Sequence, residues 1–230
     1  DYFTKGLKIK EEIGDQIGIA GTLNNIGLIY KEHGDYKRAL ENLQRCMEIE
    51  KSLGDQRGVG NSLSNIGGIY HDREQYDLAL DFYTRSLEIL EELDDKRGMA
   101  STLNNIGVIY QDQGEYARAL DFFKRSLELR KELGDQRAVA SSLNNIGNNY
   151  KKQHEYNKAL EYSLQSNAIT QKIGAATQTR HATQSLWEIY KKLGRLEESL
   201  NMHELFVATR DSIESEENQE EVIRQEYKYE

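Results

Sequence analysis

The chain has 230 residues, of which 37% are apolar and 30% are charged, and its formal net charge at pH 7 is −9. This acidic balance argues against a nucleic-acid partner, because affinity for nucleic acid comes largely from Lys and Arg side chains that neutralise phosphates. No apolar run approaches the roughly 18 residues that a membrane-spanning helix needs. We therefore expect no nucleic-acid binding and no membrane contact within this sequence.

The sequence repeats with a period of 40 residues. The stretch from Ser101 to Leu120, STLNNIGVIYQDQGEYARAL, returns in altered form before and after itself. Small residues stay in register in four copies: Gly27, Gly67, Gly107 and Gly147, followed by Ala39, Ala79, Ala119 and Ala159. A fixed period in this range is typical of a helical solenoid, in which each unit buries its apolar face only against its neighbours.

The first residues read as the inside of a repeat rather than its beginning. Asp1 to Thr4 align with Asp81 to Thr84, which fall in the second helix of a later unit. We therefore expect that the first helix of this opening repeat is missing. Tyr2, Phe3 and Leu7 would then lack the helix that should cover them.

Each following unit contains two stretches with apolar residues at spacings of three and four, which predict two helices joined by a short turn. In the third unit, Leu103, Ile106 and Tyr110 mark the first helix, and Ala119 and Phe123 mark the second. The first helices are predicted at 16–33, 56–73, 96–113, 136–153 and 177–193. The second helices are predicted at 35–53, 75–93, 115–133, 155–173 and 195–212.

Small residues on these helices predict close packing. Gly107 and Ala119 would let the two helices of one unit approach, and a larger side chain would force them apart. Cys46 is the only cysteine and aligns with Ser86, Ser126 and Ser166. We therefore interpret Cys46 as a small packing residue rather than a nucleophile.

The fifth unit departs from the pattern. Trp187 stands where other units have glycine, and Ser199 stands where they have alanine. Either this unit packs differently because it caps the array, or Trp187 anchors a partner. The following residues are rich in Glu, Gln and Arg, which favour helix. We divide the chain into a solenoid of residues 1–212 and a charged helical extension of residues 213–230.

The motif Leu103-x2-Ile106-Gly107-x2-Tyr110, followed by Ala119-x3-Phe123, resembles the tetratricopeptide repeat. The unit is 40 residues long rather than 34, and the usual proline after the second helix is absent. This longer variant is similar to the repeats of bacterial signalling proteins, kinesin light chains and spindle-orientation adaptors. The resemblance implies an all-α fold, a right-handed α-solenoid of about five helix pairs plus a C-terminal helix, with the exposed face of the first helices lining a concave, peptide-binding wall.

Residues that could carry chemistry are scattered. The five histidines, His33, His71, His154, His181 and His203, lie in four different repeats, and none pairs with Cys or carboxylates at zinc-ligand spacing. No glycine-rich phosphate loop occurs. We therefore predict no catalytic residue, no metal and no cofactor.

Asparagines recur along the predicted concave wall. Asn24, Asn104 and Asn144 flank the apolar stripe of their helices, whereas Asn25, Asn65, Asn105, Asn145 and Asn148 lie farther from it. Asparagine inside a helix costs about half a kcal/mol relative to alanine, so its repetition needs compensation. A primary amide has both donors and an acceptor, which suits the backbone of an extended peptide. The alternative is a ladder of hydrogen bonds between adjacent repeats.

Charge varies along the ends of the first helices. The early units end in acidic or mixed pairs, and the late units end in lysine pairs that include Lys151, Lys152 and Lys192. These lysines could orient a bound chain by its acidic portion or its terminal carboxylate. Alternatively, they only offset the negative ends of the helix dipoles.

These observations predict a scaffold that binds a protein or peptide, and the resemblance suggests the sensor or regulatory module of a larger bacterial signal-transduction protein. Two alternatives stay open: a stand-alone adaptor that bridges protein partners, and a solenoid that forms a homodimer through its end helices. The compartment is left open by the sequence. A cytoplasmic location is favoured, with membrane attachment of the full-length protein as an alternative.

Overall fold

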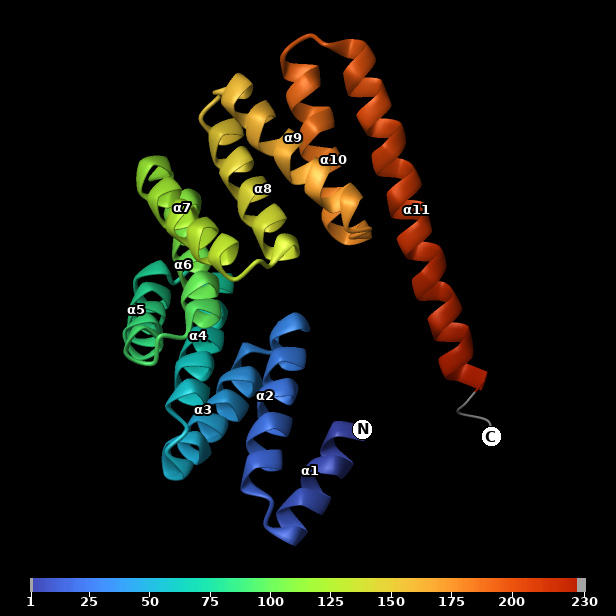
Figure 1. Ribbon diagram of the computed structural model, residues 1–230. Helices are drawn as coiled ribbons and strands as arrows, with labels where there is room; N and C mark the ends of the chain where they lie inside the picture. Colours follow the sequence, from blue (N-terminus) through green and yellow to red (C-terminus); the bar gives the residue numbers. More distant parts are fainter. Residues whose placement is uncertain (1, 227–230) are drawn as a thin grey trace. The chain divides into compact units, whose positions relative to one another are not determined.

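The computed structural model describes the backbone of residues 2–226 and the side chains of residues 5–215 and 219. This part of the chain consists of α-helices joined by short turns (Figure 1). The first helix, α1, spans Tyr2–Ile13. The first helices of the following repeats are α2 (Gln16–Glu32), α4 (Gln56–Asp72), α6 (Lys96–Asp112), α8 (Gln136–Lys152) and α10 (Ala176–Lys192). The second helices are α3 (Tyr36–Leu53), α5 (Tyr76–Glu92), α7 (Tyr116–Glu132), α9 (Tyr156–Lys172) and α11 (Leu196–Glu226).

The helix bounds agree with the sequence prediction to within one residue at every end except the last. Helix α11 does not end at residue 212 but continues to Glu226. The charged extension is therefore a continuation of α11, and the boundary at residue 212 that composition suggested lies inside this helix. The prediction that Tyr2 and Phe3 are uncovered concerns side chains outside the described residues. Leu7 is half-buried, because it packs against a core cluster that contains Ile19, Leu23 and Cys46.

The chain divides into two compact units. Unit 1 comprises residues 1–113 with helices α1–α6, and unit 2 comprises residues 114–230 with helices α7–α11. Within each unit, a first helix packs most extensively on the second helix that follows it, and each pair then packs on the next one. This arrangement of neighbouring pairs is what the 40-residue period predicted.

Acidic caps start the first helices α2, α4, α6 and α8, whereas α10 begins after Ala175 without a side-chain cap. Asp15, Asp55, Asp95 and Asp135 each accept a hydrogen bond through their side chain from the backbone N–H three residues further on. An Asp at this position satisfies a backbone donor that the helix itself leaves unpaired. Gly54 precedes one of these caps with φ +72°, a left-handed conformation that glycine adopts without strain. The Gly-Asp pairs that punctuate the sequence are therefore helix stops followed by helix starts.

The small residues keep the two helices of a pair close together. A Cβ atom added to Gly67 would lie 3.1 Å from the ring of Tyr83 and 3.3 Å from the carbonyl oxygen of Ala79. Ser86 is fully buried between the helices, and its Oγ donates a hydrogen bond to the carbonyl oxygen of Gly60 at 2.7 Å. The same contact occurs between Ser166 and Ala140 and between Cys46 and Ala20.

Cys46 is fully buried, as its interpretation as a packing residue predicted. Its thiol lies 3.1 Å from the carbonyl oxygen of Ala20. Burial raises the pKa of Cys46 to about 12, so that the neutral thiol is strongly favoured. A thiol in this state has little nucleophilic character.

Trp187 serves the packing of the last helix pair. The centroid of its ring lies 4.5 Å from the ring centroid of His203 and 6.1 Å from that of Phe206, on which it is stacked. Both His203 and Phe206 belong to α11. Ser199, which replaces alanine, donates a hydrogen bond to the carbonyl oxygen of Trp187 at 3.1 Å. The two sequence departures in the fifth unit thus belong to one local arrangement, in which α11 packs against a tryptophan instead of a glycine.

Candidate functional site

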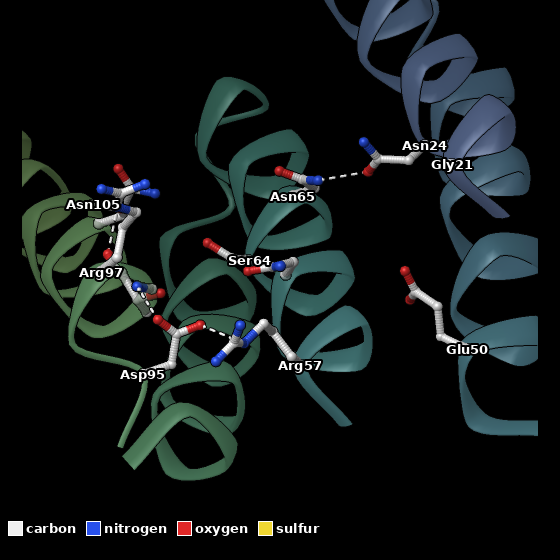
Figure 2. A pocket seen from close by; sticks show the side chains of 13 residues that line it. Gly21, Asn24, Glu50, Arg57, Ser64, Asn65, Asp95, Arg97 and Asn105 are labelled. Carbon is white, nitrogen blue, oxygen red and sulfur yellow. Dashed lines mark hydrogen bonds and ion pairs between the residues drawn. The ribbon is translucent and has the colours of Figure 1, made fainter. Parts of the chain in front are cut away.

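A groove lies across the first helices of unit 1, and we call it the amide groove (Figure 2). Its cavity volume is about 650 Å³. It is lined by Gly21, Asn24, Glu50, Arg57, Asn61, Ser64, Asn65, Asp95, Arg97, Gly98, Ser101, Thr102 and Asn105. Helices α2, α4 and α6 supply most of these residues, and α3 supplies Glu50. The lining is therefore rich in amides and hydroxyls, which can exchange hydrogen bonds with a peptide.

Two of the predicted asparagines pair with each other in this groove. The Nδ2 atom of Asn65 donates a hydrogen bond to Oδ1 of Asn24 at 2.8 Å. This is the bond between adjacent repeats that the structural alternative predicted. Within the described residues, however, Asn24 Nδ2 and Asn65 Oδ1 make no other hydrogen bond, and Figure 2 shows them at opposite ends of the pair. The pair thus presents both a donor and an acceptor to the groove.

The other predicted asparagines of unit 1 lie in different surroundings. Asn105 is half-buried on α6 and lines the amide groove. Asn25 is exposed and lines a neighbouring hollow with Lys10 and Thr22. Asn104 is half-buried and does not line the groove. The structure therefore brings Asn24, Asn65 and Asn105 together in the amide groove, whereas Asn25 shares the neighbouring hollow with Asn24, and Asn104 lines neither.

Charged side chains line the lower part of the groove in Figure 2. Arg57 Nε forms an ion pair with Asp95 Oδ2 at 3.0 Å, and the Asp95 side chain is only 15% exposed. Glu50 accepts a hydrogen bond from Ser62 Oγ at 2.7 Å. Burial raises the pKa of the Glu50 carboxyl above its ordinary value, and the negative charge of Asp55 raises it further. Arg57, Asp95 and Glu50 were not among the predicted site residues.

Side chains near the ends of the first helices connect neighbouring repeats. In unit 1, Lys31 Nζ lies 3.3 Å from Asp72 Oδ2, and His71 Nε2 lies 3.0 Å from Asp112 Oδ2. Lys31 and His71 each contact the residue 41 positions later, as Asn24 does. The acidic character that we expected of the early units is thus partly neutralised by Lys31.

The equivalent side chains of unit 2 meet with a different offset. Ser185 Oγ donates to Asn148 Oδ1 at 2.6 Å, and Lys151 Nζ lies 2.6 Å from Glu188 Oε2. Both contacts join residues 37 positions apart. In unit 1 the position equivalent to Glu188 is Gly68, where an added Cβ atom would lie 3.1 Å from Lys31 Nζ, so Lys31 passes this glycine and reaches Asp72 instead. Asn144 and Asn145 are half-buried on α8. Within the described side chains, the buried Oδ1 of Asn144 has no hydrogen-bond partner.

The predicted lysines gather in a second hollow, which we call the lysine cavity. Its volume is about 630 Å³. It is lined by Lys151, Lys152, His154, Tyr156, Trp187, Glu188, Lys191 and Lys192. It belongs to unit 2, as do Asn144, Asn145 and Asn148, whereas the amide groove belongs to unit 1. The aromatic lining from Tyr156 and Trp187 was not predicted together with the lysines, because the sequence gives these residues different repeat positions.

Within the described region, no three His, Cys, Asp or Glu side chains gather as metal ligands. None of the helices in the described region has an apolar stretch long enough to cross a bilayer. That the chain has no catalytic residue and no cofactor stays a prediction.

The comparison with known families agrees with this architecture. The sequence profile of the tetratricopeptide repeat family matches residues 18–92 and 98–172, which together make up more than half of the chain. The chain belongs to the tetratricopeptide repeat family. The predicted family and the all-α solenoid fold are thereby confirmed. No curated protein sequence matches the chain.

Solved structures show the same fold at low sequence identity. BtubC (BKLC) from P. vanneervenii has a TM-score of 0.80 and 18% identity, and the match covers 93% of this chain and 90% of that one. A Rap protein complexed with competence and sporulation factor has a TM-score of 0.76 and 17% identity, over 86% of this chain and 55% of that one. NprR in complex with its cognate peptide NprX has a TM-score of 0.67 and 20% identity, over 90% and 61%. The chain thus spans little more than half the length of Rap and NprR.

Proposed function

We propose that the chain binds a protein or peptide segment, in extended conformation, along the amide groove of unit 1. The observation that carries this proposal is the pairing of Asn24 with Asn65, which leaves one amide donor and one amide acceptor facing the groove. An extended peptide offers alternating N–H and C=O groups, so such a pair can bind its backbone without reading its sequence. Asn105 adds a third amide on the next first helix.

The structural relatives support a peptide as the ligand. The solved Rap protein holds competence and sporulation factor, and the solved NprR holds its cognate peptide NprX. A further solved relative is a signal-transduction ATPase with a tetratricopeptide repeat sensor, from Pyrococcus horikoshii, with a TM-score of 0.66 and 18% identity over 88% of this chain and 35% of that one. We infer that this chain is likewise the sensor or regulatory module of a larger signal-transduction protein. The alternative of a stand-alone adaptor also uses a peptide-binding groove.

We propose that the lysine cavity of unit 2 is a binding hollow in its own right. Lys151, Lys152 and Lys192 line it beside Trp187, and Lys151 forms an ion pair with Glu188. Four lysines and one glutamate leave an excess of positive charge in a chain whose net charge is −9. An acidic segment of the partner, or its terminal carboxylate, would complement this charge.

Self-association through the end helices stays a prediction, and apolar side chains on those helices favour it. Ile9 and Ile13 on α1 are 58% and 71% exposed, and Leu196 on α11 is 72% exposed. Sedimentation velocity over a range of protein concentrations would test it. A homodimer predicts a sedimentation coefficient that rises with concentration, and a constant monomer value would rule it out.

The groove proposal can be tested with peptides selected from a phage-displayed random library on the complete 230-residue chain. The affinity of a selected synthetic peptide would be measured by calorimetry for the wild type, for Asn65→Ala with Asn105→Ala, and for Asn157→Ala. Asn157 is exposed on α9 and serves as the matched control. We expect the double variant to bind at least about tenfold more weakly, because two amide hydrogen bonds are lost.

Far-UV circular dichroism and thermal melting of the same variants separate binding from folding. Unchanged helicity with weaker binding supports the proposal. Equal affinity of the double variant and the wild type would contradict it, and a large loss of melting temperature would make the asparagines structural instead.

A further inference from the structure

One position near the end of each second helix reaches the start of the next first helix. Lys10 and Arg130 occupy this position in α1 and α7. Lys10 donates a hydrogen bond to the carbonyl oxygen of Gly18 at 3.2 Å and another to the hydroxyl of Thr22 at 2.8 Å. Arg130 makes the equivalent bonds to the carbonyl oxygen of Ala138 at 3.0 Å and to the hydroxyl of Ser142 at 2.7 Å. Leu90 and Thr170 occupy it in α5 and α9 and are fully buried. Only in α3 is the position acidic, where it holds Glu50.

Because Glu50 is an acid where Lys10 and Arg130 are bases, it accepts hydrogen bonds where they donate them. Ser62, twelve residues further on, donates to Glu50 Oε2 at 2.7 Å, and the Cys46 thiol lies 3.4 Å from Oε1. Both partners are neutral. Within the described side chains no cation lies within ion-pair distance of Glu50, since Arg57 is paired with Asp95 instead. The negative charge of Glu50 is therefore hydrogen-bonded but not neutralised.

This carboxylate lies on the wall of the amide groove, where a ligand can reach it. Glu50 is half-buried and lines the same groove as Asn24 and Asn65, and Figure 2 shows it extending from α3 below Asn24. Gly58 makes room for it, because a Cβ atom at Gly58 would lie 2.8 Å from the Glu50 carboxyl. Burial raises the pKa of Glu50, which means that its charged form is under-compensated by the protein.

We propose that Glu50 selects a peptide carrying a cationic group, an ammonium or a guanidinium, for the amide groove. This inference rests on the proposed function and adds the chemical class of the ligand. The amides bind the backbone without regard to sequence, whereas Glu50 binds one positively charged group and thereby fixes the position of the peptide. Hydrogen bonds between ionised partners are about twice as strong as neutral ones, and partial burial protects them from solvent. The cationic group is either the amino terminus of the peptide or a Lys or Arg side chain.

The test uses an array of synthetic hexapeptides, probed with the complete chain. The amino terminus of each peptide is either free or acetylated, and one side chain is either Lys or its uncharged analogue norleucine. The combinations separate the positive charge of the amino terminus from that of the side chain. The proteins compared are the wild type, Glu50→Gln, Glu50→Leu and Glu48→Gln. Glu50→Leu copies the occupant of the same position in α5 and guards against misfolding of the amide variant. Glu48 is exposed on the same helix and controls for the loss of one negative charge.

We expect the wild type and Glu48→Gln to bind cationic peptides about tenfold more tightly than their matched neutral forms. Glu50→Gln and Glu50→Leu should lose this preference while still binding the neutral forms. The inference is overturned if the wild type shows no preference, or if both Glu50 variants keep it. If no hexapeptide binds any of the four proteins, the proposed function itself fails, and this inference fails with it.

Discussion

The second repeat, residues 56–95 in unit 1, and the fourth repeat, residues 136–175 in unit 2, have equivalent helices but different interiors. The second repeat buries Ile69, Tyr83, Leu87 and Leu90, and the fourth buries Asn149, Ser163, Asn167 and Thr170 at the equivalent positions. In the fourth repeat, Asn149 Nδ2 donates to the carbonyl oxygen of Tyr116 at 3.0 Å. Within the described side chains, Ser163 Oγ and Asn167 Oδ1 have no hydrogen-bond partner.

The contrast shows which contacts hold the helix pair together. In both repeats a small residue on the second helix donates a hydrogen bond to a backbone carbonyl oxygen of the first helix, at 2.7 Å from Ser86 and at 2.8 Å from Ser166. In both, a Cβ atom on the facing glycine, Gly67 or Gly147, would lie 3.3 Å from a carbonyl oxygen of the partner helix. The small residues thus set the distance between the helices, and the larger interior residues set the stability. A buried polar atom without a partner costs about 1–3 kcal/mol, so the fourth repeat should be the less stable.

The largest expected effect comes from making the second repeat resemble the fourth. Tyr83→Ser removes a ring that is 3% exposed and leaves a cavity and a buried hydroxyl. We expect the free energy of unfolding, measured by urea denaturation, to fall by about 3–5 kcal/mol. Leu78→Ser on the same helix, where Leu78 is half-exposed, should change it by less than about 0.5 kcal/mol. Similar effects of the two substitutions would mean that the Tyr83 interior does not set stability.

The reverse change should stabilise the fourth repeat. Asn167→Leu places in α9 the residue that Leu87 and Leu127 provide at this position, and it removes the unpartnered amide oxygen. We expect the free energy of unfolding to rise by about 1–2 kcal/mol, because an unsatisfied acceptor is replaced by apolar area. The control is Asn157→Leu on the exposed side of α9, which should leave the urea midpoint nearly unchanged. A lower midpoint for Asn167→Leu would show that this interior is adapted to its polar residues.

Ion pairs between first helices should matter less than either interior. Double-mutant cycles with alanine would compare the Lys31–Asp72 pair of unit 1 with the Lys151–Glu188 pair of unit 2. Both pairs are partly exposed to solvent, so each coupling energy should be about 0.2–1 kcal/mol and should shrink in high salt. A coupling energy well above this range in unit 2 would assign the lysine cavity a structural role.

The smallest effect should be the pH dependence that Glu50 contributes. Its pKa is raised in the folded protein, so the folded state holds this proton more tightly than the unfolded state does. Folding stability should therefore fall as pH rises from the ordinary carboxyl pKa through the raised value. Urea unfolding across this range should show that the stability of Glu50→Gln relative to wild type increases with pH. A constant difference would mean that Glu50 is not desolvated by the protein.

The sequence predicted the helices well, because their boundaries are encoded locally. Aspartates such as Asp55 cap the first helices, and apolar residues at spacings of three and four define the packed faces. Helix beyond residue 212 was predicted as well, because the run of Glu, Gln and Arg there favours helix and contains no stop signal, and α11 continues to Glu226. Composition changes there, but the backbone conformation does not.

The pairing between first helices could not be predicted from the repeat alone. Aligned residues are 40 positions apart, yet the observed contacts join residues 41 apart in unit 1, as in Asn24–Asn65, and 37 apart in unit 2, as in Lys151–Glu188. The offset depends on which side chain the facing helix supplies: Lys151 meets Glu188, whereas the equivalent Lys31 passes Gly68 and reaches Asp72. That Asn65 meets a ligand stays a prediction, and its hydrogen bond to Asn24 in particular was not assigned from the sequence.

Glu50 was missed for a different reason. Glutamates on helices are usually solvated, and near the end of α3 this one resembles its exposed neighbour Glu48. The signal that could have revealed it is a comparison down the repeat, where the same position holds Lys10 and Arg130. An acid at a position that otherwise holds bases or uncharged residues indicates a change of partner, and here the change places a carboxylate in the groove.

The central claim, that the amide groove of unit 1 holds the ligand, can be tested by photo-crosslinking. Asn61, an exposed residue of the groove, is replaced by p-benzoylphenylalanine, and Asn157 on α9 is replaced in a matched control. Both proteins are irradiated with the peptide selected from the phage library, and the adducts are measured by mass spectrometry. We predict crosslinking from position 61, competed by excess unlabelled peptide, with little from position 157. Equal yields from both positions, or none from position 61 despite binding, would contradict the account.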